Sequence, residues 1–579
     1  MLSPEAVLSP RVSAAIERAF GPDFQDADPV LRPSQYADVQ VNAALALAQR
    51  LGLRPREVAE RIVVHLEVDD VCDRVEVSGP GFLNLTIGDG WVSAQTTAMA
   101  ADPRLGVPVE DALTVPIDYS APNVAKEMHV GHLRTTVVGD ALARTLEHLG
   151  HRVVRQNHIG DWGTPFGMLL EHLLEVGEES PEARLVETDP NAFYQAARTR
   201  FDADEAFATR ARARVVALQA GDPHSLEVWR RLVGLSKHYF NAIYARLGIS
   251  LADDDLAGES TYDDDLAAVC DELTQAGIAV ESEGALCVFL DGYTGREGRP
   301  QPLIIRKSDG GYGYATSDLA TVRHRVRTLG ADRMLYVIGA PQALHLEMVW
   351  ATARKAGWLP PEVETVHVRI GNVLGDDRKI LRTRSGAPLR LMALLDEAVA
   401  AARAVLDEHR PELDEATRTA VAPQVAMAAV KYADLSVAHD SEYVFDLARM
   451  VAPTGNTGPY IQYATARIRS IFRNAGVHPD DATTAVPVDV VEPAERVLAL
   501  ALLELGPVVT AVGLHLEPHR LCGYLFGLAQ AFSQFYEHCP VLKAEDERVR
   551  ASRLALCATT LRVLVTGLDL LGIEAPERM

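Results

Sequence analysis

The chain has 579 residues, of which 48% are hydrophobic and 23% charged, the balance of a soluble globular protein. This length is too great for one hydrophobic core, so about three or four domains are predicted. The formal net charge of −24 argues against a general nucleic-acid binder, but it does not exclude local basic patches that contact phosphate. No stretch approaches the roughly 18 uninterrupted apolar residues of a membrane span, and the N-terminus lacks a signal-peptide pattern. We therefore expect a cytoplasmic protein without membrane contact.

Six cysteines are scattered along the chain, at positions 72, 270, 287, 522, 539 and 557. None forms a Cys-x-x-Cys pair, which argues against a structural zinc site, and their wide spacing does not suggest a disulfide framework. We expect buried free thiols and no zinc.

The first part of the chain, residues 1–105, is predicted to form a small α/β domain. Apolar residues recur at helical spacing over 8–20 and 39–51. A strand pattern follows over 74–77, and residues 79–86 are predicted to form a Gly-Pro-Gly turn and then a second strand.

Residues 106–400 alternate between strand and helix patterns, which indicates a parallel sheet. The strands are expected over 113–119, 152–156, 334–338 and 365–370, with a helix over 131–149. A mostly helical insertion is expected at about 167–260, with charged helices over 192–219 and 225–247.

Residues 401–579 are predicted to be all helical, because apolar residues recur every three or four positions and give each helix a core face. The expected helices cover 417–436, 460–475, 494–514, 518–537 and 549–571.

The most informative motif is His129-Val-Gly-His132, at the start of the helix that follows the first strand of the central region. A strand, a turn and a helix start form a phosphate site, because free N–H groups and the positive end of the helix dipole face the anion. Two histidines one turn apart can reach the same phosphate. The alternatives are ordinary helix-entry residues or half of a metal site.

This motif resembles the HIGH signature of class I aminoacyl-tRNA synthetases. The longer string Ser120–Arg134, together with Gln156-Asn-His-Ile-Gly-Asp-Trp162, resembles arginyl-tRNA synthetases in particular. The resemblance covers essentially the whole chain. Gly79-Pro-Gly-Phe-Leu-Asn84 resembles the extra N-terminal domain of that family, and Gly572-Ile-Glu-Ala-Pro-Glu-Arg-Met579 resembles the end of its helical anticodon-binding domain.

The resemblance implies a fold: a Rossmann-like catalytic domain with a helical insertion, a small α/β N-terminal domain that contacts the corner of tRNA, and an all-α anticodon-binding domain. It also implies an activity. L-arginine is activated with ATP and Mg²⁺ to arginyl-adenylate and transferred to the 3′ end of tRNA(Arg), with release of AMP and diphosphate. The partners are then tRNA(Arg), L-arginine and ATP, and we expect a monomer.

The resemblance assigns ATP binding to His129, Gly131 and His132, where Gly131 leaves room for the nucleotide. The second signature of the class, a Lys-Met-Ser-Lys-Ser loop, has its nearest match in Leu381-Arg-Thr-Arg-Ser-Gly386. Thr383 and Arg384 stand where the first serine and second lysine would be. A basic surface loop is the alternative interpretation.

The first lysine of that loop is missing, and Leu381 stands in its place. In the family a lysine just before the HIGH motif is thought to substitute, and Lys126 occupies that position. Lys379, on the loop itself, is the competing candidate. The predicted catalytic residues are therefore Lys126, His129, His132 and Arg384.

The side chain of the implied substrate is a guanidinium, which carboxylates recognise in a planar, bidentate arrangement. Tyr314 and Asp318 lie one helical turn apart and match the family's Tyr-x-x-x-Asp pocket. Without that match the two would be interpreted as a helix N-cap and a core residue. The resemblance gives the arginine-binding set as Asp118, Asn123, Glu283, Tyr314, Asp318 and Gln342, with His345 in the segment that completes the pocket.

Contacts with tRNA are predicted for residues in both flanking domains, namely Phe82, Asn84, Tyr460, Gln462 and Arg467. Arg467 belongs to a small basic patch with Arg469 and Arg473, for which simple solvation is the alternative.

Two other functions are weighed. A class I synthetase for glutamate, glutamine or cysteine is disfavoured, because the zinc-ligand cysteines are absent and an acidic pocket does not suit an anionic substrate. The second alternative function is that of a paralogue, which binds tRNA without charging it or serves a specialised pathway. The complete motifs argue for activity, while Leu447 and the Leu381–Arg384 loop depart from the family pattern.

Overall fold

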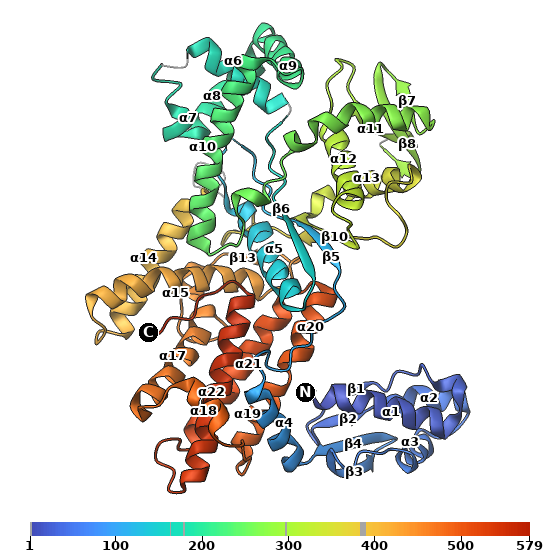
Figure 1. Ribbon diagram of the computed structural model, residues 1–579, viewed down its shortest axis with the longest axis vertical. Helices are drawn as coiled ribbons and strands as arrows, with labels where there is room; N and C mark the ends of the chain where they lie inside the picture. Colours follow the sequence, from blue (N-terminus) through green and yellow to red (C-terminus); the bar gives the residue numbers. More distant parts are fainter. Residues whose placement is uncertain (1–2, 125, 163, 178–179, 296–297, 382–388) are drawn as a thin grey trace.

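The computed structural model describes residues 3–579 except 125, 163, 178–179, 296–297 and 382–388. A central α/β region carries a helical insertion on one side, and a helical C-terminal region lies on the other (Figure 1). The N-terminal unit lies beside the C-terminal helices, away from the insertion (Figure 1). All six cysteines are buried free thiols, as expected.

The N-terminal unit is an antiparallel sheet with strand order β1-β2-β4-β3, covered by helices. The prediction of a helix beginning at residue 39 was wrong at its start. Residues 39–41 form a strand because the side chains of Val39 and Val41 point into the core on alternate positions, and the helix begins only after Asn42. The elements are α1 (Pro4–Phe20), β1 (Leu31–Pro33), β2 (Val39–Val41), α2 (Ala43–Leu51), α3 (Pro55–Val64), β3 (Cys72–Ser78), β4 (Phe82–Ile87) and α4 (Asp89–Ala101).

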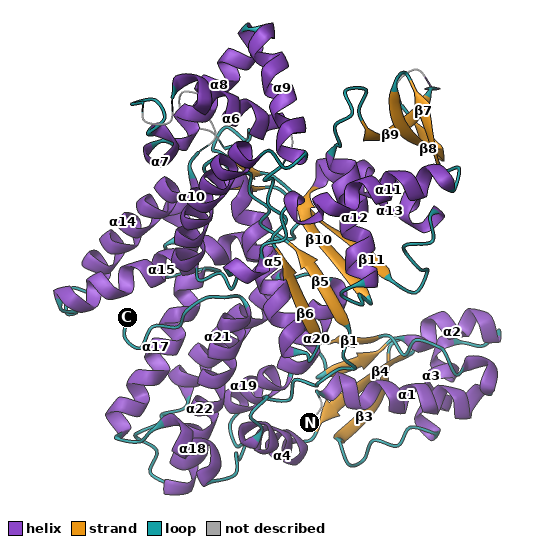
Figure 2. Cartoon of the chain, turned by 45° about the horizontal axis from the view of Figure 1, so that its top comes forward, coloured by secondary structure: helices purple, strands orange, loops and turns teal. Residues whose placement is uncertain are grey.

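The central sheet has the order β11-β10-β5-β6 and all of its pairs are parallel, which confirms the predicted parallel sheet. Figure 2 shows it enclosed by helices. The chain adds β6 on one side of β5 and later adds β10 and β11 on the other. Ligands bind at such a reversal, in the crevice at the carboxyl ends of the strands. The elements are β5 (Thr114–Asp118), α5 (Val130–His148), β6 (Arg152–Gln156), α12 (Tyr314–Arg327), β10 (Arg333–Gly339), α13 (Ala343–Lys355) and β11 (Glu364–Ile370).

Between β6 and α12 the chain forms the helical insertion and then a small antiparallel sheet, β7-β8-β9, that the sequence pattern does not predict. The helix expected over 192–219 is two helices. The Asp204 carboxylate accepts hydrogen bonds from the N–H groups of Ala206 and Phe207, at 3.0 and 3.1 Å, and so starts a new helix. The elements are α6 (Thr164–Val176), α7 (Leu185–Thr188), α8 (Pro190–Ala203), α9 (Glu205–Gln219), α10 (Pro223–Leu247), α11 (Asp263–Gln275), β7 (Ala279–Ser282), β8 (Ala285–Thr294) and β9 (Pro300–Arg306).

Apart from a two-residue strand, the C-terminal region is helical as predicted, although the helix expected over 494–514 is broken at Glu504. Two described stretches, Pro493–His515 and Glu547–Leu570, could cross a membrane by length and composition alone, a test that buried core helices also pass. Half of the first apolar window and 72% of the second are buried in the protein. The elements are β12 (Val373–Leu374), α14 (Leu391–His409), α15 (Glu415–Leu435), β13 (Tyr443–Val444), α16 (Leu447–Met450), α17 (Gly458–Ala475), α18 (Pro479–Ala485), α19 (Pro493–Leu503), α20 (Leu505–His515), α21 (His519–His538) and α22 (Glu547–Leu570).

A buried ion pair fastens α5 to α15. Arg134 Nε lies 3.0 Å from Asp434 Oδ1, and the two side chains are 1% and 0% exposed. The Arg134 guanidinium also donates to the carbonyl oxygens of Ser441, at 2.6 Å, and Ala438, at 3.4 Å. The helix that begins at the signature histidines is thus held by the C-terminal helices.

We predict that Arg134→Met lowers the free energy of unfolding by about 3–5 kcal/mol, because it leaves the Asp434 carboxylate buried without its cation. Arg61→Met is the matched control, since Arg61 pairs with Glu57 on the surface of α3, where both side chains are about half exposed. Such a surface pair contributes less than about 1 kcal/mol. Urea unfolding of the two variants measures the difference, and equal losses would contradict the prediction.

Candidate active site

The site begins at the crevice beside the carboxyl end of β5, where His129 and His132 form the first turn of α5. The backbone N–H of His129 donates to His132 Nδ1, and the N–H of Gly131 donates to His129 Nδ1, both at 3.1 Å. Because each Nδ1 accepts a hydrogen bond, each ring carries its proton on Nε2. The helix cap therefore leaves two Nε2–H donors for an anion.

Both histidines are neutral near pH 7. Burial lowers the pKa of His129 and lowers that of His132 to about 3, and the nearby positive charge of Lys126 acts in the same direction. The ring centroids are 4.1 Å apart. A pair of neutral donors can bind a phosphate without first losing or gaining a proton, so this part of the site does not titrate in the physiological range.

A side chain at Gly131 would crowd the His129 ring. A Cβ on Gly131 would lie 2.8 Å from Cε1 and 2.9 Å from Nδ1 of the His129 ring. Beside this turn lies a cavity of about 270 Å³. It is lined by residues of the first turns of α5, the ends of β10 and β11, and the segment after β12: His129, Val130, Gly131, Arg134, Thr135, Gly339, Pro341, Ile370, Gly371, Asn372, Val373, Ile380 and Leu381.

The predicted second signature segment begins at this cavity. The N–H of Leu381 donates to the carbonyl of Val373 at 2.9 Å, which places Leu381 on the cavity wall. Lys379 is exposed on the same hairpin. The predicted residues Thr383 and Arg384 lie outside the described residues.

The two histidines, His129 and His132, are not part of a cluster of metal-ligating side chains among the described residues. Among the described residues, no group of three or more His, Cys, Asp or Glu side chains is placed to hold a metal ion. The described residues therefore offer no further ligands that would support the alternative interpretation, in which the two histidines are half of a metal site.

The predicted guanidinium pocket centres on Asp318, in the first turns of α12. His345 Nε2 lies 2.6 Å from Asp318 Oδ2, and His158 Nε2 lies 3.8 Å from Asp318 Oδ1. The ring of Tyr314, 69% exposed, meets the His345 ring edge-on at 5.1 Å between centroids. The two predicted pocket segments, Tyr314–Asp318 and that of His345, are therefore brought together, and they are joined by His158, for which no pocket role was predicted.

Glu259 is the acidic residue that the sequence analysis missed. It lies in the electrostatic range of Asp318, His158 and Asp161. Burial is the main cause that raises the pKa of Glu259 to about 7, His158 opposes that rise, and the negative charges of Asp318 and Asp161 add to it. Two carboxylates that disfavour each other's charge are suited to a cationic ligand.

The Glu259 turn is seated on the segment Asn157–Trp162. The Asp161 carboxylate accepts a hydrogen bond from the N–H of Ser260 at 2.9 Å and another from its hydroxyl at 2.5 Å. A Cβ on Gly258 would lie 2.7 Å from both Asp161 oxygens, so glycine is required there. In the sequence, the only sign of this turn was the run Gly258-Glu-Ser260. It was overlooked because the acidic runs on either side of it indicated solvent-exposed loop residues.

The other predicted arginine-binding residues are distributed as follows. Asp118 ends β5 with its carboxylate 2.8 Å from the buried Arg325 guanidinium, while its second oxygen is buried without a hydrogen bond. Asn123 is exposed, and its side chain lies over Gly160. Gln342 is exposed just before α13. Glu283 lies at the exposed β7–β8 turn, and none of its described contacts reaches Asp318.

Comparison with known proteins decides the family. Residues 95–447 match the model for the catalytic domain of class I (R) tRNA synthetases, 6–87 the arginyl tRNA synthetase N-terminal domain, and 461–579 the DALR anticodon binding domain. The chain is 66% identical over 579 residues to an arginine–tRNA ligase of Thermobifida fusca, with 100% of each chain covered. The chain belongs to the arginyl-tRNA synthetase family.

Solved structures of arginyl-tRNA synthetases agree with this assignment. The crystal structure of the Plasmodium falciparum protein aligns with a TM-score of 0.85 at 25% identity, with 100% of both chains covered. The Thermus thermophilus protein aligns over 100% of both chains with a TM-score of 0.81 at 24% identity, which shows the shared fold.

The residues predicted for tRNA contact in this family member differ in exposure. The Asn84 amide is buried between Gln40 and Ser78, and Gln462 is fully buried with its amide on the carbonyl of Glu574, at 2.7 Å. Phe82 and Tyr460 are half-buried, and Arg467 is exposed. The surface available for contact in this set comes from these last three residues.

The two remaining arginines of the basic patch are not simply solvated. Arg469 donates to the carbonyls of Ala575 and Pro576, at 3.0 and 2.7 Å, and Arg473 donates to that of Glu577, at 3.2 Å. They hold the C-terminal segment along α17.

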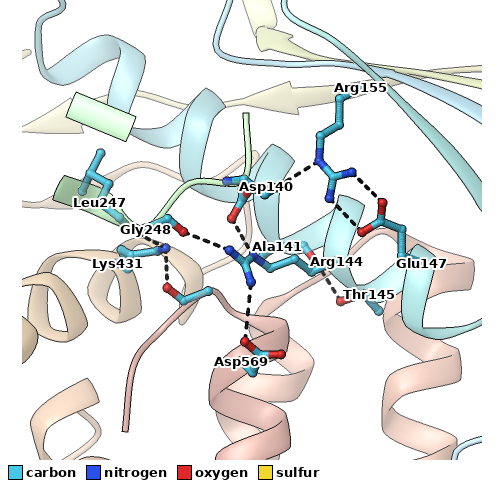
Figure 3. Close-up of polar contacts among 12 residues, drawn as sticks. Asp140, Ala141, Arg144, Thr145, Glu147, Arg155, Leu247, Gly248, Lys431 and Asp569 are labelled. Atoms are coloured by element: carbon cyan, nitrogen blue, oxygen red, sulfur yellow. Dashed lines mark hydrogen bonds and ion pairs between the residues drawn. The ribbon is translucent and has the colours of Figure 1, made fainter. Parts of the chain in front are cut away.

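The start of the same C-terminal segment lies in a polar cluster that includes a buried lysine (Figure 3). Lys431 Nζ donates to the carbonyls of Leu247, at 2.8 Å, and Gly572, at 2.6 Å. Burial lowers the pKa of Lys431 to about 8, and the charge of Asp140 on α5 opposes that change. Asp140 also accepts from Arg144 Nε at 2.8 Å, so α5, α10, α15 and the C-terminal segment meet at one polar cluster.

Proposed function

We propose that this chain joins L-arginine to tRNA(Arg), with the crevice at β5 and β10 as its active site. The reaction has two steps. A carboxylate oxygen of arginine attacks the α-phosphorus of ATP and diphosphate leaves. A terminal ribose hydroxyl of the tRNA then attacks the carbonyl carbon of the adenylate and AMP leaves. The observation that supports the specificity is that the Glu259 carboxyl lies within the electrostatic range of Asp318, so two acidic groups are available for one guanidinium.

Activation needs little covalent help from the protein. It needs positioning of the two substrates, and donors where negative charge develops. We assign the donors to the Nε2–H groups of His129 and His132 and to the N-terminus of α5, because His129 and the first turn of that helix line the cavity that would hold the nucleotide. Lys126 and Arg384 complete the proposed cationic groups.

We propose that Mg²⁺ enters with ATP. Magnesium commonly binds through nucleotide phosphates with one or two carboxylates and waters, so a separate cage of protein ligands is not required. The described residues that line the cavity beside His129 include no carboxylate, so this cavity suits phosphate oxygens rather than a metal ion. We further propose a cytoplasmic monomer without zinc, with arginine-binding roles for Asp118, Asn123, Glu283, Tyr314 and Gln342 and tRNA contacts by Phe82, Tyr460 and Arg467.

The proposed function is tested by Asp318→Asn. We expect the variant to weaken the use of arginine by a factor of roughly 10–150, which corresponds to about 1.5–3 kcal/mol for a charged hydrogen bond, while the KM for ATP changes little. Amino-acid-dependent ATP–pyrophosphate exchange, measured with tRNA present, gives both constants. Lysine should remain a poor substrate, since a point charge cannot replace a planar fork. Unchanged arginine kinetics would remove Asp318 from the pocket.

A second prediction concerns pH. Because the pKa of Glu259 is about 7 in the free protein, its carboxyl is largely protonated at pH 6 and ionised at pH 8. A bound guanidinium favours the ionised form, so the KM for arginine should rise about tenfold as pH falls from 8 to 6. In Glu259→Gln this rise should disappear, with a higher KM at every pH. A rise that persists in the variant would remove Glu259 as the cause of the pH dependence.

A third prediction separates the two candidate lysines. Negative charge grows on the leaving diphosphate, and removal of one preorganised group that stabilises such charge costs about 2.7–4 kcal/mol, or a hundred- to thousandfold in rate. We expect Lys126→Ala to lose activity on this scale with tRNA affinity nearly unchanged, and Lys379→Ala to lose much less. A near-normal Lys126→Ala beside an inactive Lys379→Ala would reverse the assignment.

A further inference from the structure

Lys126 lies against an aromatic ring from the helical insertion. Its Nζ is 4.2 Å from the centroid of the Tyr194 ring, and both residues are half-buried. Tyr194 belongs to α8, far along the chain from the loop that carries Lys126. The contact therefore brings the insertion to the edge of the proposed nucleotide site.

The ammonium of Lys126 stays close to the signature histidines while it rests on this ring. Its charge contributes to the lowered pKa of both His129 and His132. A cation at this place is near the donors that face the cavity.

The acidic side chains nearby are paired with a different cation. Arg390 Nε lies 2.8 Å from a Glu127 carboxylate oxygen, and Arg390 Nη2 lies 3.2 Å from Asp189 Oδ1. This pairing of the carboxylates with Arg390 matters for the charge of Lys126. A carboxylate bound to Lys126 would neutralise the ammonium, and an incoming phosphate would have to displace that carboxylate. A ring face attracts the ammonium through its quadrupole and adds no opposing charge.

Tyr194 is presented by a well-anchored helix. The Asp189 side chain caps α8 by accepting from the N–H of Ala192 at 3.1 Å. The next side chain, Phe193, is 1% exposed and packs against the His172 ring with centroids 5.1 Å apart. Phe193 thus fixes the helix within the insertion while Tyr194 faces the catalytic region.

We propose that Tyr194 is a positioning residue for arginine activation, which holds the Lys126 ammonium, with its charge unneutralised, at the edge of the nucleotide site. This inference rests on the proposed role of Lys126 in stabilising the leaving diphosphate. It gives the insertion a direct part in the chemistry of the first step.

The test compares three single variants in arginine-dependent ATP–pyrophosphate exchange with tRNA present. Tyr194→Leu should lower kcat about three- to tenfold, the scale of a partly exposed cation–π contact, and leave the KM for arginine unchanged. Tyr194→Phe keeps the ring face and should retain nearly full activity. Phe201→Leu is the matched control, because Phe201 makes a similar contact with Arg198 on the same helix, with 5.5 Å from the guanidinium carbon to the ring centroid.

A double variant separates positioning from simple folding of the insertion. In Lys126→Ala, the further change Tyr194→Leu should have no additional effect, because the ring then has no ammonium to hold. An equal loss in both backgrounds, or a normal rate for Tyr194→Leu beside an impaired Lys126→Ala, would overturn the inference. A normal Lys126→Ala in an active protein would instead refute the role of Lys126, and an unmodified chain that does not activate arginine would refute the proposed function.

Discussion

The position of one buried helix, α5, is the constraint on which the rest of this structure depends. Its first turn carries the two histidines, and its side is fixed by the ion pair of Arg134 with Asp434, in which both side chains are almost completely buried. A buried pair of this kind adds little net stability but is costly to break, so it holds the helix in one place. Further along, Asp140 joins the cluster around Lys431. The catalytic end of α5 and the C-terminal helices therefore cannot move independently without separating buried charges.

This arrangement gives a physical connection between the C-terminal helical region and the helix that carries the two histidines. The C-terminal segment lies on α17 through Arg469 and Arg473, and its Gly572 carbonyl is bound by Lys431, which also binds the end of α10. Gly572, in the part of the chain matched to an anticodon binding domain, thus binds the same ammonium group as Leu247 at the end of the insertion helix α10 (Figure 3). Asp140 on α5 lies in the electrostatic range of that group.

The two halves of the proposed site achieve opposite electrostatic results by the same means, burial. Burial keeps His129 and His132 neutral, so that they act as donors to phosphate without a charge of their own. Burial also raises the pKa of Glu259 beside Asp318, which makes that carboxyl reluctant to ionise until a cation arrives. In the proposed site, the neutral histidine donors would therefore bind the nucleotide, and the acidic pocket would bind the guanidinium group of arginine.

The sequence alone determined the motifs and many of the local elements, because both are encoded at short range, but it missed the strand at 39–41, the helix break at Asp204 and the sheet β7-β8-β9. The β6 strand and the turn at His129–His132 were predicted correctly, since strand periodicity and a helix start are read from neighbouring residues. What only the tertiary structure decided was proximity across the chain. Glu259 is recognisable as a pocket residue only after folding seats its turn on Asp161, and Tyr194 meets Lys126 only because the insertion folds back over the loop. Such contacts depend on how separate helices and strands pack, and no pattern among adjacent residues contains that information.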